Sequence, residues 1–209
     1  TIPPDNEIWY VTSDNTIINL EASYPAYASS PFDANVVSHT YENGRGVILC
    51  DKPITVINDH VFGNNRFLNM THLFLPNTIT TLNTGAICGT GVEELRIPDD
   101  LKMVGSYALT SKYFKRFEGK HVSEDGRCVI IEDGFRPDYG STLTPAKNYM
   151  AAFAPSGLTE YTLPAKVEIL GWYVFYQSPE LRVIRFNEGL KSILGECFDN
   201  ATLDCEIVF

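Results

Sequence analysis

A short motif that recurs along the chain is the feature that most constrains its fold. Four segments share the order apolar-x-x-apolar-x-apolar-turn, and their turn residues are Pro76, Pro98, Pro164 and Asn187. After each turn residue, apolar side chains return three, six, ten and eleven positions later, and a fifth copy follows Asp51. Successive starts lie 22 to 25 residues apart, except for one interval of 66 residues, which equals three periods of 22. This period is typical of a solenoid, in which coils too small to fold alone stack around a common core.

Each copy predicts one short strand and one pair of core residues. The positions before the turn alternate as in a strand with one buried side, so equivalent strands of stacked coils are expected to form one parallel sheet along a face. The residues ten and eleven positions after the turn are expected to fill the core, and we call them the plug pairs: Val61-Phe62, Ala86-Ile87, Ala108-Leu109, Val174-Phe175 and Cys197-Phe198. The predicted fold class is α/β to mostly-β, a solenoid with one parallel sheet.

Two parts of the chain depart from the repeat. Residues 1–50 carry no copy, and we predict an N-terminal cap there, because the first coil would otherwise expose an apolar side and a free strand edge. Residues 51–209 are predicted to form the solenoid, interrupted over 120–157 by an extended coil or a projecting hairpin. We expect one structural domain overall.

The repeated unit resembles the BspA-like leucine-rich repeat, strand-Pro-x-x-Ile-x-x-Ile-x-x-x-Ala-Phe. The resemblance runs from Asp51 to Phe209 apart from the irregular part, and Gly105 and Gly171 match a Gly that is usual near the Ala-Phe pair. Residues 1–50 resemble the leader segment that often precedes such repeats in surface proteins of host-associated anaerobic bacteria. The resemblance implies export to the bacterial cell surface or periplasm, and adhesion or contact with host and matrix proteins. Since the sequence begins at Thr1 rather than Met, a lipid anchor on a segment outside it is compatible with this interpretation.

Charge and hydropathy exclude several classes of partner. The chain has 16 Lys and Arg against 26 Asp and Glu, a formal charge of −10, whereas nucleic-acid binders and binders of anionic membranes need clustered cations. The longest uninterrupted apolar run, Met150 to Ala154, is far shorter than the roughly 20 residues that span a bilayer. We therefore expect no nucleic-acid partner and no membrane insertion by this segment.

Sequence signatures of catalysis and of cofactor or metal binding are missing. The chain has no G-x-S-x-G, H-E-x-x-H or C-x-x-C, and its two G-x-G matches lack the third Gly of a phosphate loop. We predict no catalytic residue, no metal ligand and no cofactor, and hence no enzyme. The five cysteines lie on different coils and are expected to be mostly free thiols, with Cys50 and Cys197 buried. Cys197 and Cys205 are the one pair to check.

The candidate that remains is the outward side of the repeated strands. Side chains at the x positions of the motif should stand in rows across one face, about 4.8 Å apart from strand to strand. We call this set the strand face and predict that it binds a protein or, alternatively, a glycan: His72, Phe74, Glu94, Arg96, Arg116, Glu118, Glu160, Thr162 and Arg185. The structural alternative is a solvated face whose charges block edge association. Charge reversal at Arg96 and Arg185 together is expected to weaken binding without lowering the melting temperature.

Two further hypotheses place the function elsewhere. A glycan-binding or glycan-processing protein would use a pocket between the cap and the 120–157 segment. This hypothesis requires that two of the residues His39, His121, Asp133 and Asp138 lie within hydrogen-bond reach in a concave pocket. The third hypothesis is a purely architectural part of a longer surface protein, which would bind no ligand.

Overall fold

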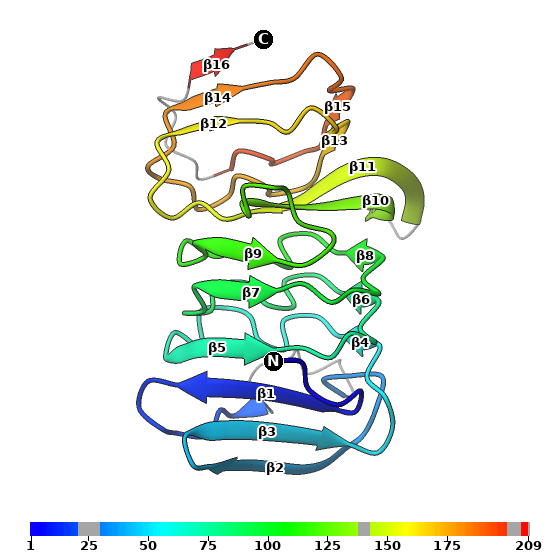
Figure 1. The fold of residues 1–209 in the computed structure, drawn as a ribbon, viewed down its shortest axis with the longest axis vertical. Coiled ribbons are helices and arrows are strands. Elements are labelled where there is room, and N and C mark those ends of the chain that lie inside the picture. Colours follow the sequence, from blue (N-terminus) through cyan, green and yellow to red (C-terminus); the bar gives the residue numbers. More distant parts are fainter. Residues whose placement is uncertain (21–29, 138–142, 200–205, 209) are drawn as a thin grey trace.

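The computed structural model describes residues 1–20, 30–137, 143–199 and 206–208, with side chains in these ranges except at 133–137, 143–146 and 206–208. The elements within the described residues are β-strands. They are stacked along one long axis, with β2 (Val36–Glu42) near one end and β16 (Glu206–Val208) near the other (Figure 1). The prediction of a mostly-β solenoid is confirmed.

The N-terminal strands form an antiparallel sheet on the first complete coil. The strands, in their order across the sheet, are β2, β3 (Arg45–Cys50), β1 (Glu7–Thr12) and β5 (Met70–Phe74). Asn43 and Gly44, at φ +52° and +77°, form the two-residue turn between β2 and β3, where left-handed residues are favoured. Ile8 and Tyr10 of β1 are fully buried. The pairing of β1 with β5 covers the edge that the first coil would expose.

The repeated strands lie on one side of the solenoid. They are β5 and, in chain order, β7 (Glu94–Arg96), β9 (Arg116–Glu118), β12 (Glu160–Thr162), β14 (Val183–Arg185) and β16. β7 pairs with β9, β12 with β14, and β14 with β16, all in parallel. The central residue of each strand from β7 to β14 is buried between two more exposed neighbours, as the alternation predicted.

A second sheet, which was not predicted, lies on the other side of the coils (Figure 1). Its strands, in their order across the sheet, are β15 (Ser192–Ile193), β13 (Ile169–Leu170), β11 (Leu143–Phe153), β10 (Cys128–Pro137), β8 (Met103–Val104), β6 (Thr81–Leu82) and β4 (Val56–Ile57). Each two-residue strand ends at the apolar residue six positions after the turn residue of its coil. Coils such as those of β7 and β9, or β12 and β14, therefore pair through a second strand as well as through the repeated one, whereas β5 pairs with β1 instead of β7.

A hairpin lies within the interval of 66 residues, between β9 and β12. β10 and β11 pair antiparallel, with Cys128 opposite Phe153. β10 also pairs in parallel with β8, and β11 with β13, so the hairpin joins the two halves of the second sheet. Within the described residues it adds no strand between β9 and β12. The repeated strands are therefore divided into two groups.

The plug pairs fill the core as predicted. The first residue of each pair is at most 2% exposed, and the second residues of the first four pairs are fully buried. Phe198 is half-buried and stacks on Phe175, with ring centroids 5.1 Å apart. Burial of a large apolar side chain stabilises a fold by roughly 1.5–3 kcal/mol, so these ladders make a major contribution to the stability of the solenoid.

Directly before each plug pair, the backbone adopts the left-handed conformation. His60, Gly85, Tyr107, Tyr173 and Glu196 have φ values between +42° and +60°. This conformation costs an L-residue roughly 1–2 kcal/mol, and Gly, Asn and Asp tolerate it best. A turn repeated in every regular coil therefore holds two tyrosines in a conformation that tyrosine rarely adopts.

Candidate functional site

The residues predicted for the strand face lie on the outward side of the repeated strands. His72 and Phe74 lie on β5, Glu94 and Arg96 on β7, Arg116 and Glu118 on β9, Glu160 and Thr162 on β12, and Arg185 on β14, all exposed or half-buried. The set contains three arginines and three glutamates, whose charges cancel, whereas the whole chain carries −10. The strand face is therefore less negative than the chain as a whole.

The strand face has an aromatic part at β5 that continues onto the cap. The His72 and Phe74 rings are stacked, with centroids 6.1 Å apart and an angle of 9° between the planes. The antiparallel register sets Trp9 of β1 opposite Phe74, and opposite residues project from the same face with Cβ atoms about 4.5–5.5 Å apart. The Arg45 guanidinium lies over the Trp9 ring, 4.3 Å from its centroid. We call Trp9, Arg45, His72 and Phe74 the aromatic patch.

Trp9 and Arg45, the two cap residues of this patch, were not predicted from the sequence. The repeat begins at residue 51, so the search for equivalent positions did not extend into the cap. A signal was present in the alternation of β1, where Ile8 and Tyr10 are buried and Trp9 is half-buried. The pairing of β1 with β5 could not be read from that alternation, because no sequence offset links the two strands.

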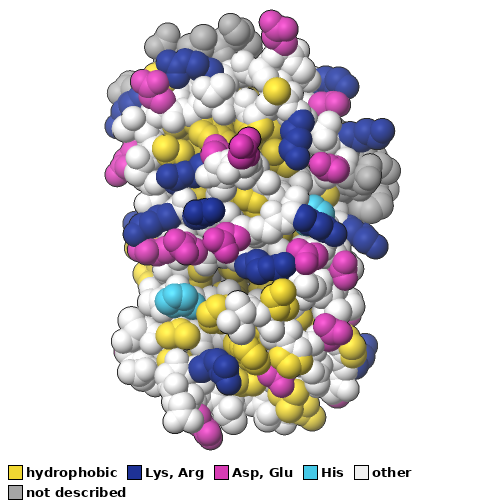
Figure 2. Space-filling view, viewed as in Figure 1, with side chains coloured by type: hydrophobic (Ala, Val, Ile, Leu, Met, Phe, Trp, Pro, Cys, Tyr) yellow, Lys and Arg dark blue, Asp and Glu magenta, His cyan; other side chains and the backbone are white. Residues whose placement is uncertain are grey.

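Charged side chains occupy the middle of the strand face. The register of β7 and β9 places Glu94 beside Arg116 and Arg96 beside Glu118. Figure 2 shows acidic and basic side chains in a band at this level, and hydrophobic side chains over β5 and the cap strands. Exposed ion pairs contribute only about 0–1 kcal/mol each to stability. The alternating charges therefore contribute little to stability, and their main effect would be on the electrostatic pattern of this surface.

Part of the predicted set surrounds one shallow cavity. This cavity lies across β5, β7 and β9 and has a volume of about 150 Å³. Five of the nine predicted residues line it, together with Thr1, Leu73 and Leu95: His72, Phe74, Glu94, Arg96 and Glu118. Pockets for small-molecule ligands usually enclose about 300–1,000 Å³. The cavity is therefore of a size to receive one side chain of a partner rather than a whole substrate.

The prediction of continuous rows across the face is wrong beyond β9. Phe117 N–H donates to the Gly126 carbonyl over 2.7 Å, and Ala154 N–H donates to the Arg127 carbonyl over 2.8 Å, so these segments occupy the space before β12. On the far side of them, Arg185 donates to the Glu160 carboxylate over 2.9 Å. The strand face thus has an N-terminal part, on β5, β7 and β9, and a separate C-terminal part, on β12 and β14.

The contacts of Arg96 change the effect that we expect from reversing its charge. Its guanidinium donates two hydrogen bonds of 2.9 Å to the Asp99 carboxylate and one of 2.7 Å to the Asn77 side-chain oxygen. These bonds link the turn after β7 to the turn of the preceding coil, and the Arg96 side chain is 31% exposed. Reversal would remove this network and place a second negative charge beside Asp99. We therefore expect Arg96→Glu to lower thermal stability, contrary to the sequence-based expectation.

The pocket predicted between the cap and the 120–157 segment is not formed by the described residues. The coils that contain β4 to β9 lie between the cap and the hairpin (Figure 1). His39 bonds to the Tyr10 hydroxyl at 2.7 Å in the cap, whereas His121 bonds to the Asp99 carbonyl at 3.0 Å after β9. The side chain of Asp133 and all of Asp138 lie outside the described part of the chain. His39 and His121 are far apart because repeated coils stand between the cap and the segment that carries His121.

The cysteines within the described residues are free thiols. Cys50, Cys128 and Cys197 are buried, as predicted for the first and third. Burial raises the pKa of the Cys50 thiol to about 11 and the pKa values of Cys128 and Cys197 to about 12. Since the thiolate is the nucleophile, these groups are unreactive near neutral pH. Cys205 lies outside the described residues.

The described residues contain neither a metal site nor a membrane-spanning helix. No group of three or more His, Cys, Asp or Glu side chains in the described ranges is arranged to hold a metal ion. The same part of the chain contains no helix that is long and apolar enough to cross a membrane.

Comparison with known proteins agrees with the solenoid. No curated protein matches the chain. A leucine-rich cell surface protein from Faecalibacterium prausnitzii A2-165 superposes with a TM-score of 0.58 at 14% identity, over 75% of this chain and 39% of that chain. The pneumococcal vaccine antigen PcpA gives a TM-score of 0.45 at 20% identity, over 65% of this chain and 33% of that one. The chain thus spans well under half the length of either structure, and the first likeness supports the fold alone.

A family profile described as BspA type leucine-rich repeat region matches the chain directly. The match comprises six copies over residues 47–118 and 146–208 and leaves out most of the cap and the first part of the hairpin. Because the matched residues are more than half of the sequence, this chain belongs to the BspA-type leucine-rich repeat family.

Proposed function

We propose that this chain is a non-catalytic binding module, exported to the bacterial cell surface or the periplasm, that adheres to a partner protein through the N-terminal part of its strand face. The observation that carries the proposal is the cavity of about 150 Å³ that adjoins the aromatic patch. Membership of a repeat family supports a binding role, since solenoids present extended faces whose outward residues vary without disturbing the core. The similar F. prausnitzii structure is described as a cell surface protein, which supports export.

The aromatic patch has the composition of an interface anchor. A few aromatic and arginine side chains beside a pocket usually supply most of the affinity of a protein interface. His72 and Phe74 border the cavity, and Trp9 and Arg45 extend the patch along β1 and β3. The alternating charges of β7 and β9 next to it would select a partner of complementary pattern and speed association.

The states of the buried thiols and of two histidines support a role without catalysis. The three buried thiols are kept protonated by burial, as described above. His39 and His121, the histidines of the alternative hypothesis, are bonded within separate parts of the fold. We therefore base the functional test on binding.

The test measures surface plasmon resonance of the immobilised chain against a panel of purified host matrix proteins. For each protein that binds, the double variant His72→Ala with Phe74→Ala is compared with Ile193→Ala. Ile193 is a matched control because it is 43% exposed on β15, in the second sheet. Both variants remove exposed apolar surface, but only the double variant alters the strand face.

We expect the double variant to weaken binding at least tenfold, about 1.4 kcal/mol, which is a moderate loss for an interface anchor. The control should bind within twofold of the unmodified chain. Equal affinities for the double variant and the unmodified chain would exclude the aromatic patch as the binding surface. Failure of every matrix protein to bind would contradict the adhesion role.

A further inference from the structure

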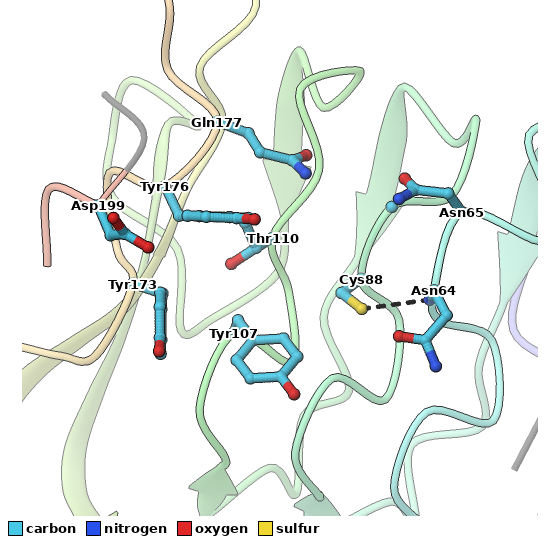
Figure 3. Close-up of a pocket in the computed structure, with 10 residues that line it drawn as sticks. Asn64, Asn65, Cys88, Tyr107, Thr110, Tyr173, Tyr176, Gln177 and Asp199 are labelled. Carbon is cyan, nitrogen blue, oxygen red and sulfur yellow. Dashed lines mark hydrogen bonds between the residues drawn. The ribbon is translucent and has the colours of Figure 1, made fainter. Parts of the chain in front are cut away.

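A second cavity lies on the turn side of the solenoid, away from the strand face. It has a volume of about 340 Å³ and lies between the turn that carries Tyr107 and the turn that carries Tyr173 and Tyr176. Asn64, Asn65 and Cys88 from the two preceding coils close the opposite side (Figure 3). Among the residues that the structure describes, none of the hairpin, the cap or the strand face lines it. The cavity is therefore independent of the proposed protein-binding surface.

Three tyrosine rings form one wall of this cavity. Tyr107 and Tyr173 meet edge to face, with centroids 5.3 Å apart and planes at 84°, and Tyr173 and Tyr176 meet at 5.6 Å and 88°. All three side chains are half-buried. Successive rings at right angles form a corner that presents ring faces in more than one direction. Ring faces carry the negative part of the aromatic quadrupole, which attracts polarised C–H groups.

Two of the three tyrosines occupy backbone positions that favour glycine. Tyr107 and Tyr173 have φ values of +42° and +57° at the turn position that Gly85 fills in the neighbouring coil. Gln177, at the rim of the same cavity, has a φ of +58°. Such conformations cost of order 1–3 kcal/mol each and cluster at functional sites. Tyr107, Tyr173 and Gln177 therefore carry a backbone cost that glycine would avoid.

The other side chains that line the cavity, within the described ranges, are mainly polar, and one of them is charged. Asn64, Asn65 and Gln177 provide amides, which both donate and accept hydrogen bonds, and Asp199 provides a carboxylate. Cys88 Sγ accepts a hydrogen bond from the Asn64 backbone N–H at 3.4 Å, which holds that turn in place. Among the described residues no Lys or Arg lines the cavity, and the charged group there that an anionic ligand would meet is the Asp199 carboxylate.

We propose that this cavity binds a neutral saccharide. A sugar ring has one face of C–H groups, which stacks on aromatic rings, and a rim of hydroxyls, which pair with amides and carboxylates. The Tyr107, Tyr173 and Tyr176 wall and the opposite amides match these two requirements on facing sides of one cavity. The volume lies at the lower end of the range for small-molecule pockets, about 300–1,000 Å³. It therefore suits one or two sugar units at the end of a glycan rather than a folded protein surface.

The test begins with a printed array of neutral, sialylated and sulfated oligosaccharides probed with the whole labelled chain. We expect signal on neutral oligosaccharides only. Titration calorimetry with the best neutral oligosaccharide then compares Tyr176→Ala, Tyr176→Phe and Tyr113→Ala. Tyr113 is a matched control because it is a partly exposed tyrosine that does not line the cavity. Tyr176→Ala should weaken binding at least tenfold, whereas Tyr176→Phe and Tyr113→Ala should stay within threefold.

A second readout uses the unmodified chain and does not depend on how the variants fold. Tyrosine nitration, followed by mass spectrometry, should decrease at Tyr173 and Tyr176 when the neutral oligosaccharide is added and remain unchanged at Tyr113. Signal confined to sialylated or sulfated oligosaccharides, or no signal on the array, would overturn the proposal. So would unchanged nitration of Tyr173 and Tyr176. Displacement of the bound oligosaccharide by a short peptide from one of the matrix proteins would show that the cavity binds protein instead.

Discussion

Replacement of Gly85 by alanine tests the left-handed turn that every regular coil repeats. Gly85 has a φ of +60°, and a Cβ added there would lie 2.5 Å from His60 Nδ1 and 2.7 Å from a Tyr107 ring carbon. The left-handed backbone costs alanine about 1–2 kcal/mol, and overpacking in a filled site costs about 1–3 kcal/mol. Alanine also reduces the conformational entropy of the unfolded chain, which offsets about 0.4–1 kcal/mol of these two costs. We expect a net loss of about 2–4 kcal/mol in the free energy of unfolding.

The assay is urea denaturation followed by far-UV circular dichroism, and its control is Gly157→Ala. Gly157 has a φ of +77°, and an added Cβ would meet no atom within 4 Å. This variant therefore carries only the backbone cost and should lose about 1 kcal/mol or less. The difference between the two variants measures the contact of the new methyl group with His60 and Tyr107. Equal losses in both variants would refute the packing described for this turn.

Three further predictions concern pH, the core and the arginines. Burial lowers the pKa of His39 below its usual value of about 6.5, so the unfolded chain binds the proton more readily. The free energy of unfolding should therefore fall as the pH drops below about 6.5. His39→Gln should make this dependence on pH weaker. Part of the dependence should remain, because burial lowers the pKa of His60 as well. Phe175→Ala should cost about 3–5 kcal/mol by urea denaturation, since the ring is fully buried among other aromatic rings; a loss below 1 kcal/mol would contradict the plug ladder. In differential scanning calorimetry, Arg96→Glu should lower the melting temperature by about 2–4 °C, equivalent to about 1 kcal/mol. Arg185→Glu should lower it by less, because the ion pair of Arg185 is more exposed. Equal shifts in the two variants would show that the hydrogen bonds of Arg96 do not stabilise the fold.

Periodicity in the sequence was sufficient to predict the core of this fold. The offsets of ten and eleven residues identified plug residues such as Ala108 and Phe175, because every coil must fill the same layer with one side chain. The alternation before each turn predicted the buried centre of the repeated strands, for example Leu95 in β7. Both signals come from side chains that repeat along the chain.

The features that sequence analysis missed depend on backbone geometry or on contacts without a fixed spacing. The left-handed turn is filled by His60, Gly85, Tyr107, Tyr173 and Glu196, which share no side-chain chemistry, so no pattern marks it. The second sheet is built from two-residue strands, too short for an alternation to appear. The extension of the strand face onto the cap depends on antiparallel pairing that only the folded chain displays.

The strand face was predicted as a set of residues, but its division was not. The nine side chains follow from the alternation of the strands. Their separation into two parts follows from the hydrogen bond between Phe117 and Gly126, which returns the chain to the edge of β9. An irregular segment of this kind has no repeat from which its path could be predicted.

Hydroxyl-radical footprinting of the complex with a bound matrix protein tests the proposed binding surface most directly. The unmodified chain is exposed to radicals alone and in the complex, and oxidation of each side chain is read by mass spectrometry. We predict that oxidation of Trp9 and Phe74 falls at least twofold in the complex, while oxidation of Ile193 on the second sheet is unchanged. Protection of Ile193 together with unchanged oxidation of Trp9 and Phe74 would contradict the assignment of the strand face as the binding surface.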